Sequence, residues 1–600
     1  MRILAFQSGL HDASAAAFED YRLVAAVQEE RLRREKGWGA GVPWLAIDEV
    51  LQIAGWTRYD VDVIALIRGV FPLQYFTFPL HRDFHYMMCK FWGFERLHRD
   101  LSNAITHSNA ITPGGTNEER LFRTDRFLAE NGFRANTQLR FVNHHEAHAL
   151  GALFFTDWDD ALIYTADGVG DNVSYSTHTL RDGRLDCLFG GDEWLKVWRA
   201  PRNSLATAYG LATMAAGFRM WRHEGKLTGL AARGEPLLYD ALARHFRLGE
   251  DGLIESDFNS TRAMQRTIQT ICRGHSRETI AASIQKLTED LISGSVGHWL
   301  RQTKARRLAL AGGLFANVSL NRLLAETLPL DEIFIYPAMG DDGLAIGAAL
   351  SYLRERDGTA AWLRQRHRLD NVYLGRDFDA RIDDVLGAEP GIRPLPGDPI
   401  DIATGLIENG AAGAIFVGRM EHGPRALGAR SIIANPTDPT INDRLNQRLN
   451  RSEFMPFAPY VLDEDADEVF EITPVNRYAA RFMTITCAVR PRWRARIPAV
   501  VHVDNTARPQ IIRDADNPLF AAILRRFRER TGIPVLINTS FNVHEEPIVN
   551  RPEECRRALI DGRVDFVVTK KAVYVAASET IPLSPAFGVE AERLDTLTPA

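Results

Sequence analysis

Few cysteines occur in this sequence, and none of them are spaced as a pair. The 600 residues hold only five cysteines, and no Cys-x-x-Cys spacing is present. A disulfide framework and a thiolate zinc site are therefore not indicated, and a reducing cytoplasm is the expected location. The opening MRILAFQSGLHD turns polar within eight residues, which is too short for the apolar core of a signal peptide. No uninterrupted apolar run of about 18 residues occurs, so no membrane span is expected.

An excess of basic residues is also missing. The formal net charge is −6, and binding to a phosphate backbone needs a concentrated basic surface, so nucleic acid is not expected as the main partner. A hydrophobic fraction of 45% and a charged fraction of 25% are typical of a globular protein. Because single hydrophobic cores stop growing at about 250–300 residues, two or more domains are expected. The oligomeric state stays open, with a homodimer as one option.

A strand-and-hairpin pattern occurs twice. Residues 2–7 predict a strand, followed by a polar loop and a hairpin over SAAAF and LVAAVQEER. The pattern returns near residue 161, where ALIYTADGVGDNVSYSTHT precedes a DGR turn and LDCLF. This repeat predicts a duplicated α/β fold with a cleft between its halves. Between the copies, the aromatic-rich residues 71–97 are expected to pack as a helical hairpin, with a lid over a substrate site as the alternative.

Further along, residues 278–301 have helical periodicity. RRLALAGGLFANVSLNRLL predicts a strand, a glycine-rich turn and a helix, and GDDGLAIGAALSYL starts another helix. The residues 388–399, rich in proline and glycine, indicate a loop near a domain junction, with a break near 356–372 as the alternative. Beyond about residue 580 the chain is expected to be partly unordered.

Two histidines in VNHHEAHA have a spacing suited to metal binding. His144 and His148 are four residues apart, so a helix places both on one face. Asp167 ends the second expected strand in TADG, and Asp341 lies in GDDG before a helix. Two imidazoles and two carboxylates suit Fe, Mn or Zn, and the sequence does not choose among them. A pair of surface histidines is the alternative, and His145, on another helical face, is not expected to be a ligand.

Glycines after an expected strand indicate a nucleotide cleft. In AGGLFANVSLN, Gly312 and Gly313 let the backbone approach a nucleotide closely, and Asn317 follows. A simple tight turn is the alternative. Together with GDDG, about 30 residues later, the segment predicts two walls of one cleft.

The first expected loop carries polar residues as well. His11 and Asp12 follow the first strand in SGLHDASAA, and in a duplicated cleft fold this loop faces the phosphates. Lys36, after QEERLRRE, is placed to reach the same region, with a solvated basic turn as the alternative.

Arginines in the C-terminal half lie in turns rich in glycine and proline. A planar guanidinium in such a turn suits bidentate binding of phosphate or carboxylate. Each arginine alone is more often structural, but the set predicts an anion pocket. The set comes from GRMEHGPRALGARS, NRSEFMPFAPYV, DNTARPQ and NTSFN and comprises Arg419, His422, Arg425, Arg430, Arg451, Arg508 and Ser540.

Taken as a set, these motifs resemble the O-carbamoyltransferase family of the nodulation and antibiotic type, which includes tobramycin carbamoyltransferase. The matching segments follow the same order over nearly the whole chain: HDASAA, EERLRREK, NHHEAHA, TADGVGD, EGKLTGLA, AGGLFANVSLN, GDDG, EHGPRALGARS, PFAP and NTSFN. The resemblance implies a Kae1-like domain of the actin/hexokinase/Hsp70 fold over residues 1–360. It implies a YrdC-like α/β domain over residues 361–580, followed by a tail over 581–600.

The same resemblance implies a reaction in two steps. The C-terminal pocket would form carbamoyl adenylate from carbamoyl phosphate and ATP with Mg²⁺. The N-terminal cleft would then transfer the carbamoyl group to a hydroxyl of a small molecule. The acceptor stays open among aminoglycosides, macrolides or polyketides, nodulation oligosaccharides and β-lactam precursors.

Matching by motif implies a role for individual residues. A divalent metal, iron in a studied relative, would be held by His144, His148, Asp167 and Asp341. His11 and Lys36 would serve the transfer site. Carbamoyl phosphate would contact Arg425, Arg451, Arg508 and Ser540. Nucleotide binding is implied for Asp12, Gly229, Gly312, Gly313, Asn317, Arg419, His422 and Asn538.

The chain departs from the family pattern at one point. Many members carry a Lys-x-Arg-Glu run and an arginine before Pro-Phe-Ala-Pro, where this sequence has Leu449 and Met455, although Arg451 remains. Two other enzyme classes stay open: an ATP-dependent small-molecule kinase or ATPase of the actin/hexokinase fold, and a threonylcarbamoyl-type tRNA modification enzyme. The acidic charge balance weighs against the second. A non-catalytic nucleotide-binding scaffold is the third alternative.

Overall fold

The computed structural model describes residues 1–9, 11–39, 41–69, 71–75, 122–171, 173–192, 203–451 and 456–577. Most of the aromatic-rich segment 71–97, together with Met455 and the expected tail, lies outside these residues, so the predictions for them stay predictions. The expected limits of the two domains also stay predictions. Among the described helices, none combines the length and the apolar character needed to cross a membrane.

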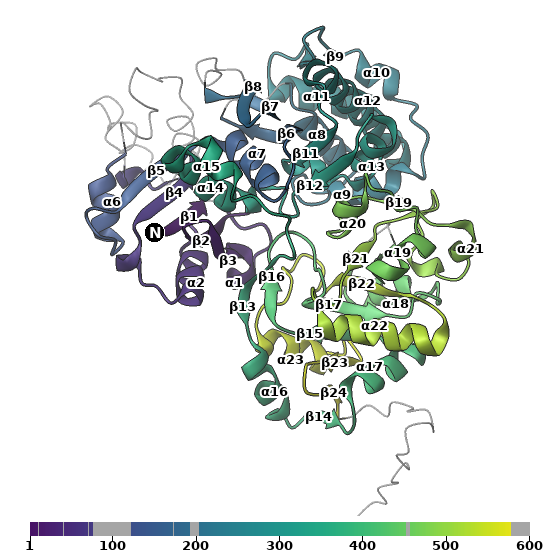
Figure 1. Ribbon diagram of the computed structural model, residues 1–600. Helices are drawn as coiled ribbons and strands as arrows, with labels where there is room; N and C mark the ends of the chain where they lie inside the picture. The colour runs from purple at the N-terminus through teal and green to yellow at the C-terminus, as the bar shows by residue number, and fades with distance from the viewer. Residues whose placement is uncertain are drawn as a thin grey trace, which may run out of the picture.

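The N-terminal half contains two five-stranded sheets with equivalent strand orders, β3-β2-β1-β4-β5 and β8-β7-β6-β11-β12 (Figure 1). In each, an antiparallel three-stranded meander continues into two parallel strands. The sequence repeat is therefore a structural duplication, and the expected actin/hexokinase-type architecture is confirmed. The strands are β1 (Arg2–Gln7), β2 (Ser14–Glu19), β3 (Arg22–Gln28), β4 (Val63–Ile67), β5 (Gln138–Val142), β6 (Ala161–Gly170), β7 (Val173–Arg181), β8 (Arg184–Phe189), β11 (Arg307–Ala311) and β12 (Glu332–Ile335).

Two helices pack against each other beside these sheets. α7 (His144–Phe154) contacts β6 and β11, and α14 (Leu344–Asp357) contacts β1 and β4. Gly347 of α14 comes so close to α7 that a Cβ there would lie 2.0 Å from the carbonyl oxygen of Ala147. Close packing of α7 and α14 brings the start of α7, and the turn before α14, to the end of β6.

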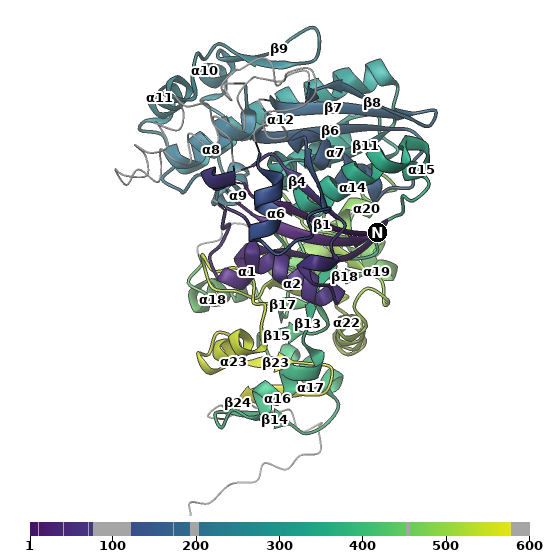
Figure 2. The ribbon, with the colours of Figure 1, turned by 90° about the vertical axis from the view of Figure 1, so that its left-hand side faces the viewer.

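The C-terminal half contains one eight-stranded mixed sheet of order β14-β24-β23-β15-β17-β22-β18-β21. Figure 2 shows it below the two N-terminal sheets. Helices α17 (Pro399–Glu408) and α22 (Pro518–Thr531) pack together against it. The strands are β14 (Ile392–Leu395), β15 (Gly413–Phe416), β17 (Arg430–Ala434), β18 (Ala458–Leu462), β21 (Gln510–Ile512), β22 (Val535–Ser540), β23 (Phe566–Val568) and β24 (Val573–Ala576).

Shorter elements complete the described chain. The longest remaining helix is α12 (Arg277–Thr303), which agrees with the periodicity of residues 278–301. A two-stranded pair, β13 (Tyr373–Asp377) and β16 (Arg419–Glu421), lies between the halves. Other helices are α1 (Glu29–Arg33), α2 (Trp44–Ala54), α6 (Thr124–Glu130), α8 (Leu205–Ala215), α9 (Glu224–Ala231), α10 (Tyr239–Ala243), α11 (Thr261–Cys272), α13 (Val318–Thr327), α15 (Thr359–Leu363), α16 (Asp379–Gly387), α18 (Ile441–Arg448), α19 (Asp463–Val469), α20 (Arg477–Ala480), α21 (Pro491–Arg494) and α23 (Pro552–Ile560).

The expectation of a loop over residues 388–399 is wrong. Ile392–Leu395 form β14, which pairs antiparallel with β24 at the edge of the C-terminal sheet. Pro394 is compatible with this strand because an edge strand leaves one side without ladder hydrogen bonds. The prolines and glycines that suggested a loop therefore stand in and around an edge strand.

Polar contacts that are buried or partly buried join the two halves. Arg31 of α1 donates to the carbonyl oxygen of Gly423 at 2.7 Å, and Arg419 donates to that of Val24 at 2.8 Å. Arg31 is almost completely buried. Because a buried guanidinium without its partners would be costly, these contacts oppose separation of the halves.

Candidate functional site

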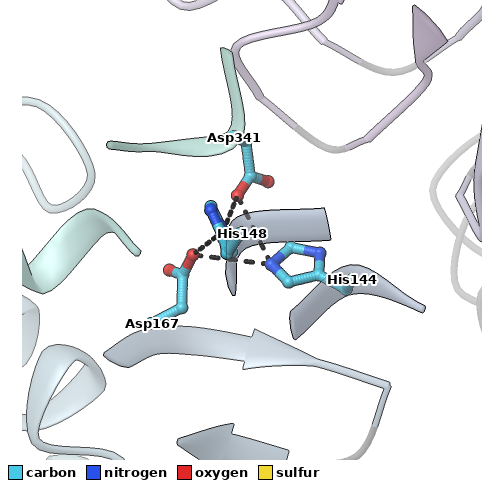
Figure 3. A group of neighbouring side chains, drawn as sticks. All are labelled: His144, His148, Asp167 and Asp341. Carbon is cyan, nitrogen blue, oxygen red and sulfur yellow. Dashed lines mark hydrogen bonds and ion pairs between the residues drawn. The ribbon is translucent and has the colours of Figure 1, made fainter. Parts of the chain in front are cut away.

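Four side chains from three elements point toward one another (Figure 3). His144 and His148 come from α7, Asp167 comes from β6, and Asp341 comes from the short turn Asp341–Gly343 before α14. His148 Nε2 lies 3.0 Å from Asp167 Oδ2 and 3.8 Å from Asp341 Oδ1. His144 Nε2 lies 3.5 Å and 3.6 Å from the same two atoms. All four residues are buried, so the structure brings together the set that the sequence singled out.

The local sequence explains why the two histidines share a face. Asn143 caps α7, since its side-chain oxygen accepts a hydrogen bond from the backbone N–H of Glu146. The helix begins at His144, and one further turn places His148 on the same side. Gly170 keeps the space open, because a Cβ there would lie 2.2 Å from Cδ2 of His144.

Opposite charges hold the cluster together. Burial raises the pKa of Asp167, but hydrogen bonds with His144 and His148 outweigh burial and hold this pKa well below its ordinary value. Burial lowers the pKa of His148, whereas Asp167 and Asp341 raise it, to about 9. The imidazole of His148 and the carboxylate of Asp167 therefore stabilise each other's charged forms.

This cluster fits a divalent cation. Bonds of about 2.0–2.2 Å to nitrogen and oxygen place neighbouring ligand atoms about 3–3.5 Å apart. The imidazole–carboxylate distances of 3.0–3.8 Å are close to that spacing. Two imidazoles and two carboxylates form a donor set for Fe, Mn or Zn, and the geometry does not discriminate among these metals. The role of the four residues as ligands stays a prediction.

His145 has a different environment. Its Nδ1 lies 2.7 Å from the hydroxyl of Thr165, and its Nε2 lies 3.1 Å from the carbonyl oxygen of Val173. Burial and the neighbouring imidazoles lower the pKa of His145 well below its ordinary value. Both ring nitrogens are engaged, which agrees with the expectation that His145 is not a ligand.

A second group of potential donors, His223, His544 and Glu545, lies between the two halves. His223 Nε2 is 2.8 Å from Glu545 Oε1, and His544 Nε2 is 3.7 Å from the same oxygen. The backbone N–H of Arg219 donates to Nδ1 of His223, so the neutral ring carries its proton on Nε2 and donates it to Glu545. A metal at Nε2 would require the proton on Nδ1, opposite that N–H. This group therefore fits a hydrogen-bonded contact better than a metal site.

The first hairpin loop lies beside the cluster. Gln7 Nε2 donates to Oδ2 of Asp341 and to the carbonyl oxygen of His11, both at 3.2 Å. His11 Nδ1 lies 2.9 Å from Oδ2 of Asp12. Burial lowers the pKa of His11, but Asp341 and Asp12 outweigh burial and raise it to about 10. A divalent cation on the cluster would neutralise part of this negative charge and lower the pKa of His11 toward its ordinary value.

Lys36 follows α1 on the side that faces the C-terminal half. Its side chain is exposed, and its charge acts on Glu545. Burial raises the pKa of Glu545, while His223, Lys36 and His544 lower it, with a net lowering. The function predicted for Lys36 in group transfer stays a prediction.

The glycine pair after β11 lies against the end of β6. Gly312 has a φ of +101°, and a Cβ there would lie 2.2 Å from the carbonyl oxygen of Ala166. A Cβ on Gly313 would be 3.4 Å from Oδ1 of Asp167. The backbone of this turn therefore passes directly beside Asp167, a candidate metal ligand, as a nucleotide cleft would need.

Asn317 has a structural role in addition to its predicted one. Its side-chain oxygen accepts the backbone N–H of Leu320 at the start of α13, and its nitrogen donates to Oε1 of Gln285 at 2.8 Å. Gly229 lies within α9. Nucleotide binding by Asn317 and Gly229 stays a prediction.

In the C-terminal half, Arg451 organises the end of β22. Its guanidinium donates to the Thr539 hydroxyl at 3.0 Å and to the carbonyl oxygens of Ser540 and Asn542 at 2.6 Å and 2.7 Å. The Ser540 hydroxyl donates to Oδ1 of Asn542 at 2.6 Å. Arg451 and Ser540, predicted to share an anion pocket, are therefore neighbours. Leu449, at one of the positions that depart from the family pattern, is buried in the core.

The loop of Arg425 is fastened to the same strand. Asn538 of β22 donates to Gln510 Oε1 at 2.7 Å and to the carbonyl oxygen of Ala426 at 3.2 Å. Gln510 donates to the carbonyl oxygen of Leu427 at 2.8 Å. Asn538 thus positions the loop of Arg425 beside β22.

Arg508 lies just before β21, which is the second neighbour of β22 in the sheet. Burial and the charge of Arg508 lower the pKa of the nearby His502 to about 4. The structure therefore places all four predicted carbamoyl phosphate residues, Arg425, Arg451, Arg508 and Ser540, in one region of the C-terminal sheet. Binding of carbamoyl phosphate by these residues stays a prediction.

Three residues of GRMEHGPRALGARS have side chains that are buried or that bond to the backbone of the protein. Arg419 donates to three backbone carbonyl groups, and the buried Arg430 does the same. Burial and the charge of Arg31 lower the pKa of His422 to about 3, so this buried ring is neutral. Nucleotide contacts of Arg419 and His422 stay predictions.

Sequence reasoning missed Gln7, Arg31 and Trp221. Gln7 ends β1, at the position in the first sheet that corresponds to the end of β6, and this equivalence is the signal that could have identified it. Nothing in the local sequence identified Arg31, which bonds across the two halves. Trp221 is exposed and its ring stacks on that of His11, with the centroids 5.9 Å apart.

Comparison with known proteins gives the family. A sequence family described as carbamoyltransferase N-terminus matches residues 2–350, and one described as carbamoyltransferase C-terminus matches residues 404–575. The nodulation protein NolNO of Sinorhizobium fredii is 32% identical over 93% of this chain and 78% of its own length. The nodulation protein NolO of Bradyrhizobium diazoefficiens is 33% identical over 71% of this chain and 77% of its own.

One solved structure with a similar fold is a more distant match. HypF of T. kodakarensis covers 59% of this chain and 48% of its own at 13% identity, with a TM-score of 0.29, which is too low to carry an argument. The two family matches lie in the same order along the chain and together span most of it. On these matches, the chain belongs to the carbamoyltransferase family and is a transferase.

Proposed function

We propose that this protein is an ATP-dependent O-carbamoyltransferase. It forms carbamoyl adenylate from carbamoyl phosphate and ATP with Mg²⁺, and it transfers the carbamoyl group to a hydroxyl of a small molecule. The proposal assigns the first step to a YrdC-like domain over residues 361–580 and the second to a Kae1-like domain over residues 1–360.

One observation carries the proposal: the chain has two separate polar centres of different chemistry. The N-terminal centre combines His144, His148, Asp167 and Asp341 with the nearby His11. The C-terminal centre is cationic and gathers Arg451 and Ser540 at the end of β22. Two centres are what a reaction needs when an anionic donor is activated in one place and consumed in another.

In the first step, the C-terminal centre binds the donor. Arg425, Arg451 and Arg508 supply positive charge for the phosphate oxygens, and the Ser540 hydroxyl turns from Asn542 to donate to them. Hydrolysis of carbamoyl phosphate by water gives carbamate and inorganic phosphate, and a carbamate oxygen then attacks the α-phosphate of ATP and expels pyrophosphate. Because the mixed anhydride hydrolyses readily in water, a closed passage between the halves protects it.

In the second step, the N-terminal centre orients the acceptor. His11 removes the proton of the acceptor hydroxyl as oxygen attacks the carbamoyl carbon, and AMP leaves. Asp12 holds the His11 ring through Nδ1, and Lys36 stabilises negative charge that develops on the transferred group. A metal bound by the four cluster residues would supply Lewis-acid polarisation and a fixed template.

The test measures each half-reaction. Carbamoyl phosphate should be required for exchange of labelled pyrophosphate into ATP, and candidate alcohols should gain about 43 Da, the mass of a carbamoyl group replacing hydrogen. Transfer of phosphate to an alcohol without carbamoyl phosphate would contradict the proposal and favour a kinase.

A further inference from the structure

A buried histidine in the C-terminal half has one ring nitrogen without a partner. His502 is only 8% exposed and lies shortly after the turn Pro498–Val500. Its Nδ1 is 3.1 Å from the hydroxyl oxygen of Thr506, whereas its Nε2 has no hydrogen-bond partner among the residues that the structure describes. Because a buried polar atom without a partner is costly, Nε2 is suited to a hydrogen-bond donor from outside the chain.

The neighbours of His502 decide which ring nitrogen carries the proton. The hydroxyl of Thr506 donates to Oδ1 of Asp504 at 2.7 Å, since a carboxylate only accepts. The same hydroxyl has no second proton, so it accepts the hydrogen bond from Nδ1 of His502. Burial outweighs the charge of Asp504 and lowers the pKa of His502 to about 4, so the ring is neutral. A neutral ring with its proton on Nδ1 presents a lone pair on Nε2.

This ring lies beside the cationic centre of the C-terminal half. Arg508 acts electrostatically on His502. Thr506 and Arg508 are alternate residues of the segment that leads from β20 (Thr506–Ala507) into β21, and the proline after Arg508 favours an extended backbone, so both side chains leave the same side. Gln510, the next alternate residue, accepts a hydrogen bond from Asn538 of β22, the strand whose end carries predicted donor-binding residues. The alternation and the electrostatic contact therefore associate His502 with that centre.

The proposed first step needs a base at this centre. Carbamoyl phosphate has to lose its phosphate to water before carbamate attacks ATP, and water is a weak nucleophile until a base removes its proton. Arginine side chains attract the anionic donor but offer no lone pair. A bound phosphate anion raises the pKa of a nearby imidazole toward its ordinary value of about 6.5, at which an imidazole is an efficient base near neutral pH.

We propose that Nε2 of His502 is the general base that activates the water in the hydrolysis of carbamoyl phosphate. The inference rests on the proposed function and assigns a catalytic residue to its first step. Nε2 takes a proton from water as the water oxygen bonds to the carbamoyl carbon. The bond from that carbon to the bridging oxygen then breaks, and the departing phosphate takes the proton from Nε2. The carbamic acid that remains loses a proton to solvent and becomes carbamate. Thr506 and Asp504 are positioning residues, because they hold the ring through Nδ1.

The variant His502→Asn tests this assignment, because the asparagine nitrogen is able to donate to Thr506 while nothing replaces Nε2. Pyrophosphate exchange into ATP is measured with two donors: carbamoyl phosphate, and freshly dissolved ammonium carbamate, which bypasses the hydrolysis. With carbamoyl phosphate, kcat should fall by at least about 100-fold with little change in KM, since the base acts on water and not on the phosphate. With carbamate, the variant should match the wild type.

A second readout follows the hydrolysis directly. Release of inorganic phosphate from carbamoyl phosphate, corrected for spontaneous hydrolysis, should fall in His502→Asn by the same factor as exchange. His245→Asn, which removes an ion pair with Asp257 in the N-terminal half, is the matched control and should keep both rates. Unchanged exchange with carbamoyl phosphate in His502→Asn would overturn the inference. An equal loss with both donors would overturn it too, because His502 would then hold the pocket together without acting on water. Absence of exchange in the wild type with both donors would instead contradict the proposed function.

Discussion

His148 Nε2 and Asp167 Oδ2 face each other at 3.0 Å, although one belongs to a helix and the other to the end of a strand. The pair exists because α7 packs on the second sheet with its first turn beside the end of β6. A change at either residue should therefore be visible in metal binding as well as in turnover.

Replacing His148 should remove the metal. His148→Ala deletes one of four donors from a buried site, so we expect the metal content of purified protein to fall by at least about tenfold. Metal analysis by mass spectrometry of folded protein gives the measurement. His145→Gln is the matched control, because both nitrogens of His145 bond to other groups; equal metal loss in the two variants would argue against the ligand assignment.

Two substitutions should separate the half-reactions. His11→Ala should lower the rate of carbamoyl transfer by at least about 100-fold, since a general base contributes a factor of this order. The same variant should keep carbamoyl-phosphate-dependent ATP–pyrophosphate exchange. Arg508→Ala should remove the exchange reaction itself. Exchange and transfer assays on both proteins decide the matter, and loss of both activities in His11→Ala would refute the division of labour.

The hydrogen bonds of the Arg451 guanidinium should matter more for exchange activity than its positive charge. Arg451→Lys keeps a cation but cannot donate at once to Thr539, Ser540 and Asn542. We expect exchange activity to drop by about 10- to 100-fold. Arg525→Lys, on the exposed side of α22, is the control and should keep wild-type exchange. Full exchange activity in Arg451→Lys would mean that the hydrogen bonds of the guanidinium to Thr539, Ser540 and Asn542 are not needed for the reaction.

The turn at Gly312 should tolerate no side chain. Gly312→Ala would place a Cβ 2.2 Å from the carbonyl oxygen of Ala166, so the strand ends must separate, at a cost of more than about 3 kcal/mol. Gly358 also has a positive φ, +80°, but nothing lies within 4 Å of a Cβ there. Gly358→Ala should cost only about 1 kcal/mol. Thermal unfolding of the two variants measures the difference, and equal Tm values would contradict the contact.

Acid should destabilise the protein through a buried histidine. Burial and the charge of Arg354 lower the pKa of His178 to about 3. The unfolded chain takes up a proton below about pH 6.5 while the folded chain does not, so stability falls between about pH 6.5 and 3, by up to about 1.4 kcal/mol per pH unit.

His178→Gln removes this titration. Between pH 7.5 and 5.0 the variant should lose on the order of 2 kcal/mol less stability than the wild type. Denaturation at the two pH values provides the comparison, with Gln365→Ala, in an exposed turn, as a surface control. An identical loss in wild type and His178→Gln would exclude His178 as a source of acid sensitivity.

Local pattern was enough to predict several parts of this protein. The strand over residues 2–7, both hairpins and the helix near 278–301 follow from short-range apolar periodicity, which depends only on neighbouring residues. The facing of His144 and His148 follows from helical spacing, and the order of the motifs indicated the family. The departure at residues 388–399 shows the limit, because a strand at a sheet edge accepts the same prolines and glycines as a loop.

Only the tertiary structure decided which distant groups meet. Asp341 reaches His144 because two duplicated sheets and the helices α7 and α14 pack together, and apolar periodicity specifies a face of an element without specifying its partner. The hydrogen bonds of Asn317 and Arg419, the proton on Nε2 of His223 and the stacking of Trp221 on His11 likewise depend on contacts between segments far apart in the chain. Hydrogen bonds and ring contacts act over a few ångströms, so their partners are selected by packing after the chain has folded.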